Sequence, residues 1–146
     1  MNPDELTYRR VFRAPRELVW RCLTEPAELA RFWGPRGMTT PLDGIVVELR
    51  PGGRFETLMT GEQGSYRMVA TFTDVVPPER VAWVEPATGV HTTSTLIDLG
   101  DDGTEVVIHQ RRVPEPMRSP QARAGFLTSL DKLEEHLARL LEGDRP

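Results

Sequence analysis

The polar and apolar positions of the chain follow two periods, and prolines separate the segments. Residues 5–15 (ELTYRRVFRAP) alternate as in a strand, which Pro15 ends. Within residues 15–26, apolar side chains recur three and four positions apart, which predicts a short helix with Pro15 in its first turn. Pro26 ends that helix, and residues 26–33 predict a second short helix that stops before Gly34-Pro35.

The middle of the chain has a period of two. Residues 44–61, 64–86 and 89–112 each predict a pair of strands, joined at Pro51-Gly52-Gly53, at Pro77-Pro78 and at the sequence GDDG. From Pro120 the period returns to about 3.6, which predicts an amphipathic helix of about twenty residues. Its apolar stripe consists of Phe126, Leu130, Leu133, Leu137 and Leu140.

This order of elements predicts an α+β fold with an antiparallel meander of six to seven strands. Such a sheet needs one face covered, and the chain offers one long helix for that purpose. A helix about 10–12 Å wide leaves part of a curved sheet uncovered, which favours a cavity between helix and sheet. We expect one domain over residues 1–146, with a core of about 5–142.

Four segments, in this order along the chain, resemble a known superfamily. They are RVFRAPRELVWRCLTEPAELARFWGPRG, ELRPGGRF, VVPPERVAW and GFLTSLDKLEEHL. The chain resembles the SRPBCC superfamily of START/Bet v 1-like helix-grip proteins, and within it the bacterial homologues of the heat-shock-protein-90 ATPase activator. The resemblance implies a curved sheet wrapped around a long C-terminal helix. It leaves the activity open, because the superfamily includes lipid carriers, polyketide cyclases, chaperone activators and self-resistance proteins.

Strand alternation predicts which side chains would line the cavity. In residues 90–99 the odd positions end in Ile97 and Leu99, so we expect the odd positions to face inward. Phe32 and Trp33 end the second short helix and are expected at the cavity rim. The predicted lining comprises Phe32, Trp33, Phe55, Thr57, Met59, Tyr66, Met68, Trp83, His91, Thr93, Thr95, Phe126 and Leu130. This mixture suits a hydrophobic or aromatic small molecule, although ordinary core packing also explains the aromatic residues and methionines.

The sequence contains few candidates for catalysis. His91 and Tyr66 are weak candidates for proton transfer, and a solvated His at a strand end is the alternative for His91. His136 is expected in solvent on the polar flank of the last helix, and Cys22 is expected to be buried and inert. The three histidines have no metal-ligand spacing, so we predict no metal site. No phosphate-binding or dinucleotide motif is present, and we expect no cofactor.

Charge and composition narrow the partners. Lys and Arg number 18 against 22 Asp and Glu, and a net charge of −4 gives no general attraction to nucleic acid or to a membrane surface. No membrane-spanning run or export signal is evident, so we expect a cytoplasmic protein. The first hypothesis is a binding protein for a hydrophobic small molecule, such as a lipid or polyketide. The alternatives are a cyclase/aromatase- or hydrolase-like enzyme using the same cavity, and a protein-binding domain like the chaperone activator. A homodimer is compatible with each.

Overall fold

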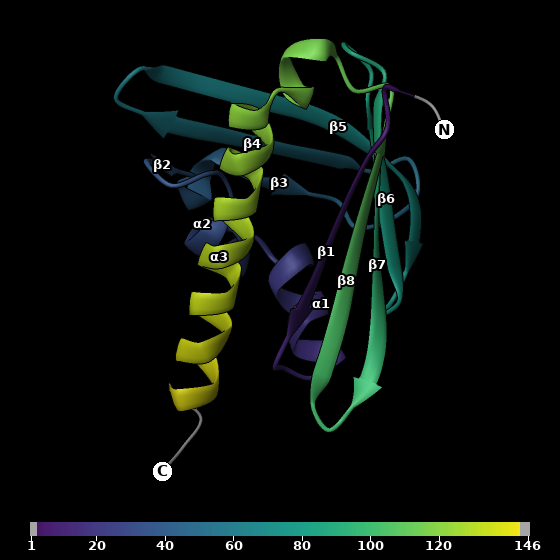
Figure 1. Ribbon diagram of the computed structural model, residues 1–146, viewed down its shortest axis with the longest axis vertical. Coiled ribbons are helices and arrows are strands. Elements are labelled where there is room, and N and C mark those ends of the chain that lie inside the picture. Colours follow the sequence, from purple (N-terminus) through teal and green to yellow (C-terminus); the bar gives the residue numbers. More distant parts are fainter. Residues whose placement is uncertain (1–2, 144–146) are drawn as a thin grey trace.

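The computed structural model describes residues 3–143 (Figure 1). The N-terminal part contains β1 (Leu6–Phe12), α1 (Arg16–Thr24), α2 (Pro26–Phe32), β2 (Met38–Thr39), the 3-10 helix η1 (Leu42–Gly44) and β3 (Val46–Val47). The remainder contains β4 (Arg54–Gly61), β5 (Gly64–Val76), β6 (Arg80–Glu85), β7 (Val90–Gly100), β8 (Gly103–Arg111), the 3-10 helix η2 (Glu115–Arg118) and α3 (Pro120–Gly143).

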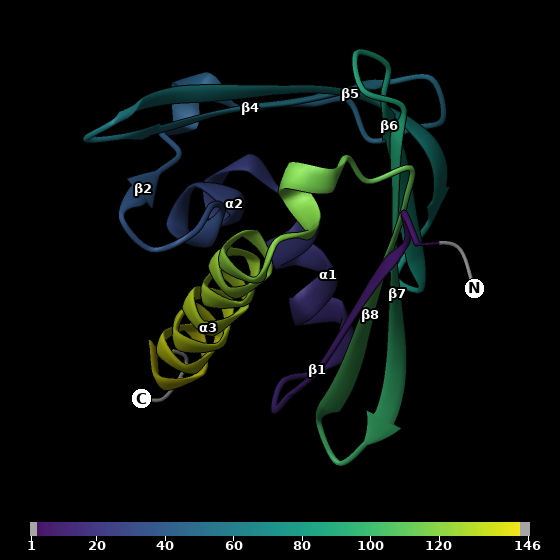
Figure 2. The same ribbon diagram turned by 45° about the horizontal axis from the view of Figure 1, so that its top comes forward.

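Within residues 3–143 the strands form one eight-stranded antiparallel sheet. Its order is β1-β8-β7-β6-β5-β4-β2, and β3 also pairs with β4. The sheet is bent, with β4 and β5 on one side and β1, β8 and β7 on the other (Figure 2). The helices α1, α2 and α3 lie on its concave side. The predicted α+β helix-grip fold is confirmed, including the two short helices after the first strand.

Prolines and a glycine set the ends of the two short helices. Pro15 precedes α1 in an extended conformation. Glu25 is extended because it precedes Pro26, which opens the first turn of α2. Gly34 follows the last residues of α2 with a φ of +98°, a conformation that favours glycine. The chain therefore turns back toward α3 immediately after Trp33.

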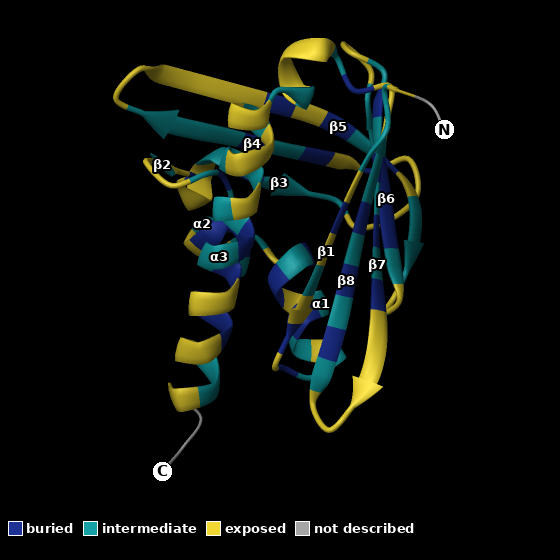
Figure 3. Cartoon of the chain, in the orientation of Figure 1, coloured by how far each residue is buried: buried dark blue, intermediate teal, exposed yellow. Residues whose placement is uncertain are grey.

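The long helix α3 covers the core with the stripe that its sequence predicts. Leu130, Leu133 and Leu137 are buried against the sheet and the short helices. Glu135 and Arg139 lie on the exposed side of α3, which is visible in Figure 3. The amphipathic pattern of residues 120–143 therefore gives the correct orientation of the helix.

The predicted orientation of β7 is wrong. In the register of the sheet, Thr92 is opposite Trp83, whereas His91 is opposite Val84. Because Trp83 faces the interior, Thr92 also faces inward and His91 faces outward. The inward set is Val90, Thr92, Ser94 and Leu96, all of which are buried, and Thr93 and Thr95 share the outer face with His91.

The reason for this error is that β7 has an apolar residue on its outer face and polar residues on its inner face. Ile97 and Leu99 are 40% and 51% exposed, and Ile97 lies opposite Glu105 on the outer face, whereas its neighbour Leu96 is buried on the inner face. The apolar character of Ile97 and Leu99 was the basis for assigning the odd positions to the interior. The orientations predicted for β4, for Met68 in β5 and for Val106 and Ile108 in β8 are confirmed by the burial of these residues.

Candidate functional site

An aromatic cluster occupies the concave side of the sheet beneath α2. The Phe55 ring lies 5.4 Å from that of Trp33, 4.9 Å from that of Trp83 and 5.2 Å from that of Phe72, measured between ring centroids. The Trp33 indole Nε1 donates a hydrogen bond of 3.1 Å to Oγ1 of Thr57, which is fully buried. Several residues predicted to line a cavity therefore pack against one another.

Five more of the predicted lining residues lie in the same interior or at its edges. Phe32, Met68 and Leu130 are buried in the core, and Phe126 stacks on Tyr8 with 4.2 Å between the ring centroids. Met59 lies against Gly34, where an added Cβ would be 2.8 Å from the Met59 sulfur.

His91 and Tyr66, the two candidates for proton transfer, lie on opposite faces of the sheet. His91 hydrogen-bonds through Nε2 to Thr73 Oγ1 at 3.2 Å on the outer face. Burial lowers the pKa of His91, and Arg111 lowers it further. Tyr66 pairs with Met59 on the inner side of the β4–β5 hairpin and is 46% exposed. The two groups therefore do not share one site.

Tyr66 instead hydrogen-bonds to Glu85, the last residue of β6. Burial raises the pKa of the Glu85 carboxyl group, and the hydrogen bond from Tyr66 opposes this rise. Burial is also the main cause of the raised pKa of Tyr66, followed by the charge of Glu85. The pair is a polar element at the edge of the interior.

The Glu85→Gln substitution is expected to stabilise the protein at neutral pH. Because the folded protein raises the pKa of Glu85, it binds this proton more tightly than the unfolded chain does. The contribution of Glu85 to the free energy of unfolding is therefore present below the ordinary pKa and is lost as the pH rises through the raised value. Urea unfolding at a series of pH values measures this. The free energy of unfolding of the variant should increasingly exceed that of the wild type between the ordinary and the raised pKa, with little difference at more acidic pH.

The Tyr66→Phe variant is the matched control for this prediction. Removing the hydroxyl removes the hydrogen bond that holds the pKa of Glu85 down, so the loss of stability with rising pH should become steeper. A Glu85→Gln protein that is less stable than the wild type at neutral pH would contradict the prediction.

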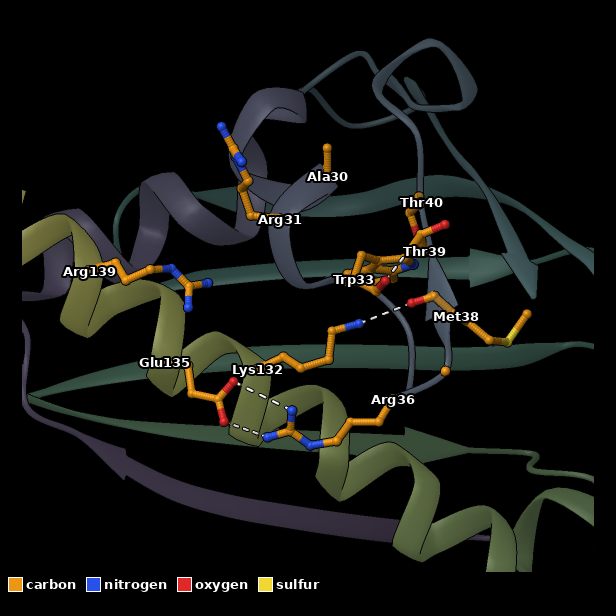
Figure 4. A pocket seen from close by; sticks show the side chains of 11 residues that line it. Ala30, Arg31, Trp33, Arg36, Met38, Thr39, Thr40, Lys132, Glu135 and Arg139 are labelled. Carbon is orange, nitrogen blue, oxygen red and sulfur yellow. Dashed lines mark hydrogen bonds and ion pairs between the residues drawn. The ribbon is translucent and has the colours of Figure 1, made fainter. Parts of the chain in front are cut away.

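An open groove lies between α2, the loop of residues 33–40 and α3 (Figure 4). Its volume is about 590 Å³. Ala30, Trp33 and Met38 contribute apolar surface to it. Its charged residues, among those the structure describes, are Arg31, Arg36, Lys132 and Arg139, with Glu135 as the acidic member. The groove is therefore cationic although the whole chain is acidic.

Contacts with α3 hold the loop that forms one wall of this groove. The Lys132 ammonium donates hydrogen bonds to the carbonyl oxygens of Gly34 and Met38, at 3.0 and 3.2 Å. Arg36 forms an ion pair with Glu135 (Figure 4). Burial and the nearby Arg36 lower the pKa of Lys132, whereas Glu135 acts in the opposite direction. Lys132, Arg36 and Glu135 are thus held in place by contacts within the protein.

The sequence pattern indicates Trp33 but not the charged residues of the groove. Trp33 is the one predicted lining residue that also lines this groove in the described part of the chain. Arg31 and Arg36 lie about a hundred positions before Lys132 and Arg139 in the sequence, so no local pattern connects them. A second open groove, between β1 and the start of α3, includes Tyr8 and Leu127 and contains none of the predicted lining residues.

The expectation that His136 is solvated is also wrong. Its side chain is buried, and its Nε2 lies 2.9 Å from Oε1 of Glu28 on α2. The helical pattern placed His136 beside the apolar stripe, and α2 covers that flank of α3. Cys22 is buried, as expected.

Comparison with known proteins places the fold in a family. The family described as "Activator of Hsp90 ATPase homolog 1-like protein" matches residues 13–138. No curated protein matches the chain. No helix in residues 3–143 combines the length and apolar character needed to cross a membrane.

Solved structures show the same fold at low sequence identity. Protein NE0264 from Nitrosomonas europaea aligns with a TM-score of 0.83 and 24% identity, covering 97% of this chain and 99% of that one. The AHSA1-like protein from Aeromonas hydrophila has a TM-score of 0.79 and 24% identity over 93% of each chain. The AHSA1 protein from Silicibacter pomeroyi has a TM-score of 0.76 and 23% identity over 92% of this chain and 97% of that one. With most of its length matched, the chain belongs to the Activator of Hsp90 ATPase homolog 1-like family, within the SRPBCC helix-grip superfamily.

Proposed function

We propose that the protein binds a small molecule that combines an apolar or aromatic body with an anionic group. The observation that supports this proposal is the groove in which Trp33 lies beside the cationic side chains of Lys132 and Arg139 on α3 (Figure 4). Trp33 also contacts Phe55 and Thr57, so the groove adjoins the aromatic cluster on the concave side of the sheet. The proposed binding site is therefore the groove between α2 and α3, in place of the cavity expected between helix and sheet.

The size and charge of the groove suit such a ligand. A volume of about 590 Å³ falls within the usual range for small-molecule sites, which is roughly 300–1,000 Å³. An aromatic body would pack on Trp33, and an anionic group would accept hydrogen bonds from Arg139 or Lys132. Hydrogen bonds between charged groups are stronger than neutral ones and fix the orientation of a ligand.

The test uses two fluorescent probes that differ by one charged group. Anilinonaphthalenesulfonate carries the sulfonate, and phenylnaphthylamine has the same ring system without it. The Arg139→Gln substitution is expected to weaken sulfonate binding by about tenfold, equivalent to about 1.4 kcal/mol. Binding of the neutral probe should change little, because Trp33 remains. Fluorescence titration of the folded protein measures both affinities.

The Arg67→Gln variant is the control for net charge. Arg67 is exposed on β5 and is absent from the groove, so its replacement should leave both affinities unchanged. Equal effects of Arg67→Gln and Arg139→Gln on the sulfonate would show general electrostatics and refute the groove. Near-ultraviolet circular dichroism verifies native packing, since loosely packed states also bind such probes.

A second candidate is protein binding of the kind named in the family description, activation of the Hsp90 ATPase. It is favoured by exposed apolar side chains on the outer face of the sheet, where Val11 and Ile97 are 53% and 40% exposed. Val11 and Ile97 lie on either side of Glu105 in the register of β1, β8 and β7. Arg139→Gln separates the two candidates, because docking on the outer face would not depend on the groove.

A further inference from the structure

The helices α1, α2 and α3 bring together three metal-binding side chains. Cys22 comes from α1, Glu28 from α2 and His136 from α3. Their candidate ligand atoms, the Cys22 Sγ, a Glu28 carboxylate oxygen and a His136 ring nitrogen, lie within 4.8 Å of one another. From this arrangement we propose that Cys22, Glu28 and His136 bind a Zn²⁺ ion at the junction of the helices.

The chemistry of the three side chains suits zinc. Thiolate sulfur, imidazole nitrogen and carboxylate oxygen are its usual protein ligands, and the thiolate disfavours Mg²⁺ and Ca²⁺. With bonds of about 2.0–2.3 Å, tetrahedral ligand atoms lie about 3.3–3.8 Å apart. The Glu28 and His136 atoms are already 2.9 Å apart, so these two must separate slightly, and Cys22 Sγ must approach by no more than about 1.5 Å. Water completes the fourth position of the ion.

The surroundings balance the charge of the ion. A Cys22 thiolate and the Glu28 carboxylate together neutralise a divalent cation, as a buried site requires. Cys22 is fully buried and His136 is 5% exposed, whereas Glu28 lies nearer the surface. Arg21 Nε lies 3.3 Å from Oε2 of Glu28, so it holds one carboxylate oxygen while the other is directed at His136. Such an outer partner orients a metal ligand.

Binding must remove a proton from the thiol. Burial raises the pKa of Cys22 to about 12, with Glu28 as the next cause; Arg21 lowers it and Glu25 raises it. At neutral pH the metal-free protein therefore carries a Cys22 thiol. Zinc binding breaks the S–H bond, forms the Zn–S bond and releases one proton to solvent.

Cobalt provides the direct test with the full-length, chelator-treated protein. Because Cys22 is the single cysteine of the chain, a thiolate-to-cobalt absorption band can arise from no other residue. We expect this band to saturate at one equivalent of Co²⁺ and to disappear on addition of Zn²⁺. Calorimetry with Zn²⁺ in buffers of different ionisation enthalpy should report about one released proton. Absence of the band at saturating Co²⁺ overturns the proposal.

Substitutions then identify the other ligands. Cys22→Ser and His136→Gln are each expected to weaken Zn²⁺ binding by more than about tenfold. The control is the double variant His91→Gln/His109→Gln, which removes the other two histidines and should bind normally. Binding that is lost in the control and kept in His136→Gln assigns the ion to the outer face of the sheet and overturns the proposal. Far-ultraviolet circular dichroism verifies that each variant is folded. If a variant does not fold, the cobalt spectrum of the wild-type protein still tests the proposal.

The opposite result is that His136 and Glu28 bind only each other and no metal ion. In that case the pair only links α3 to α2. Addition of Zn²⁺ then releases no proton from the protein and does not raise its melting temperature. A zinc-dependent rise that disappears in Cys22→Ser supports the site. The cluster shares no residue with the described cationic groove, so the probe titrations and the metal titrations can fail independently.

Discussion

Replacing Phe55 with alanine lowers the free energy of unfolding by about 3–5 kcal/mol, the usual cost of removing a large aromatic side chain from a core. Phe55 is 1% exposed and its ring contacts those of Trp33, Phe72 and Trp83. The substitution removes all three contacts and leaves a cavity beneath α2. Urea unfolding followed by far-ultraviolet circular dichroism measures the change.

The control is Val69→Ala in β5, the strand that pairs with β4, which contains Phe55. Val69 is 47% exposed on the outer face, so its replacement should change the free energy of unfolding by no more than about 0.5 kcal/mol. The size of the Phe55 effect also reports on the interior. A loss below about 1 kcal/mol would mean that the ring borders an open cavity rather than a close-packed cluster.

The fold could be predicted because its signals are local. Pro15, Pro26 and Gly34 mark the ends of the short helices, and each has the backbone conformation that its position requires. The period of the last segment assigns Leu133 and Leu137 to the core without knowledge of what covers them. Patterns of this kind depend on neighbouring residues, so they can be read from one sequence.

The error in β7 shows where local signals are insufficient. Alternation separates the two faces of a strand but does not say which face is inside. Ile97 suggested the wrong face because it is an apolar residue exposed on the outer face, whereas Thr92 is polar but buried and receives a hydrogen bond from Gln110. Which face of a strand the helices cover is a tertiary property, and it decides the assignment.

The candidate site could be predicted only in part, for a related reason. Trp33 was identified because it ends a helix beside a glycine-containing loop. The groove also needs Lys132 and Arg139, and the metal cluster needs His136, all from the far end of the chain. One helix thus serves three purposes, with its leucines in the core, Lys132 and Arg139 in the groove, and His136 against Glu28.

Replacing Trp33 with alanine is expected to impair stability and binding together. Removal of the indole should lower the free energy of unfolding by about 3 kcal/mol, because its contacts with Phe55 and Trp83 are lost. It should also weaken phenylnaphthylamine binding by at least about tenfold, since stacking on an aromatic ring contributes on the order of 1 kcal/mol beyond area burial. Urea unfolding and fluorescence titration measure the two effects on the same preparation.

The Trp33→Phe variant separates these two roles. It keeps an aromatic ring but removes the indole N–H that donates to the fully buried Thr57 hydroxyl. Leaving that hydroxyl without this donor should cost about 1–3 kcal/mol, and adding Thr57→Val should recover most of the loss. Binding of the neutral probe should survive in both variants, because the groove requires an aromatic surface and not the hydrogen bond. If Trp33→Phe instead loses binding as completely as Trp33→Ala, the hydrogen bond to Thr57 holds the groove open, and the ligand is recognised by the fixed position of the indole.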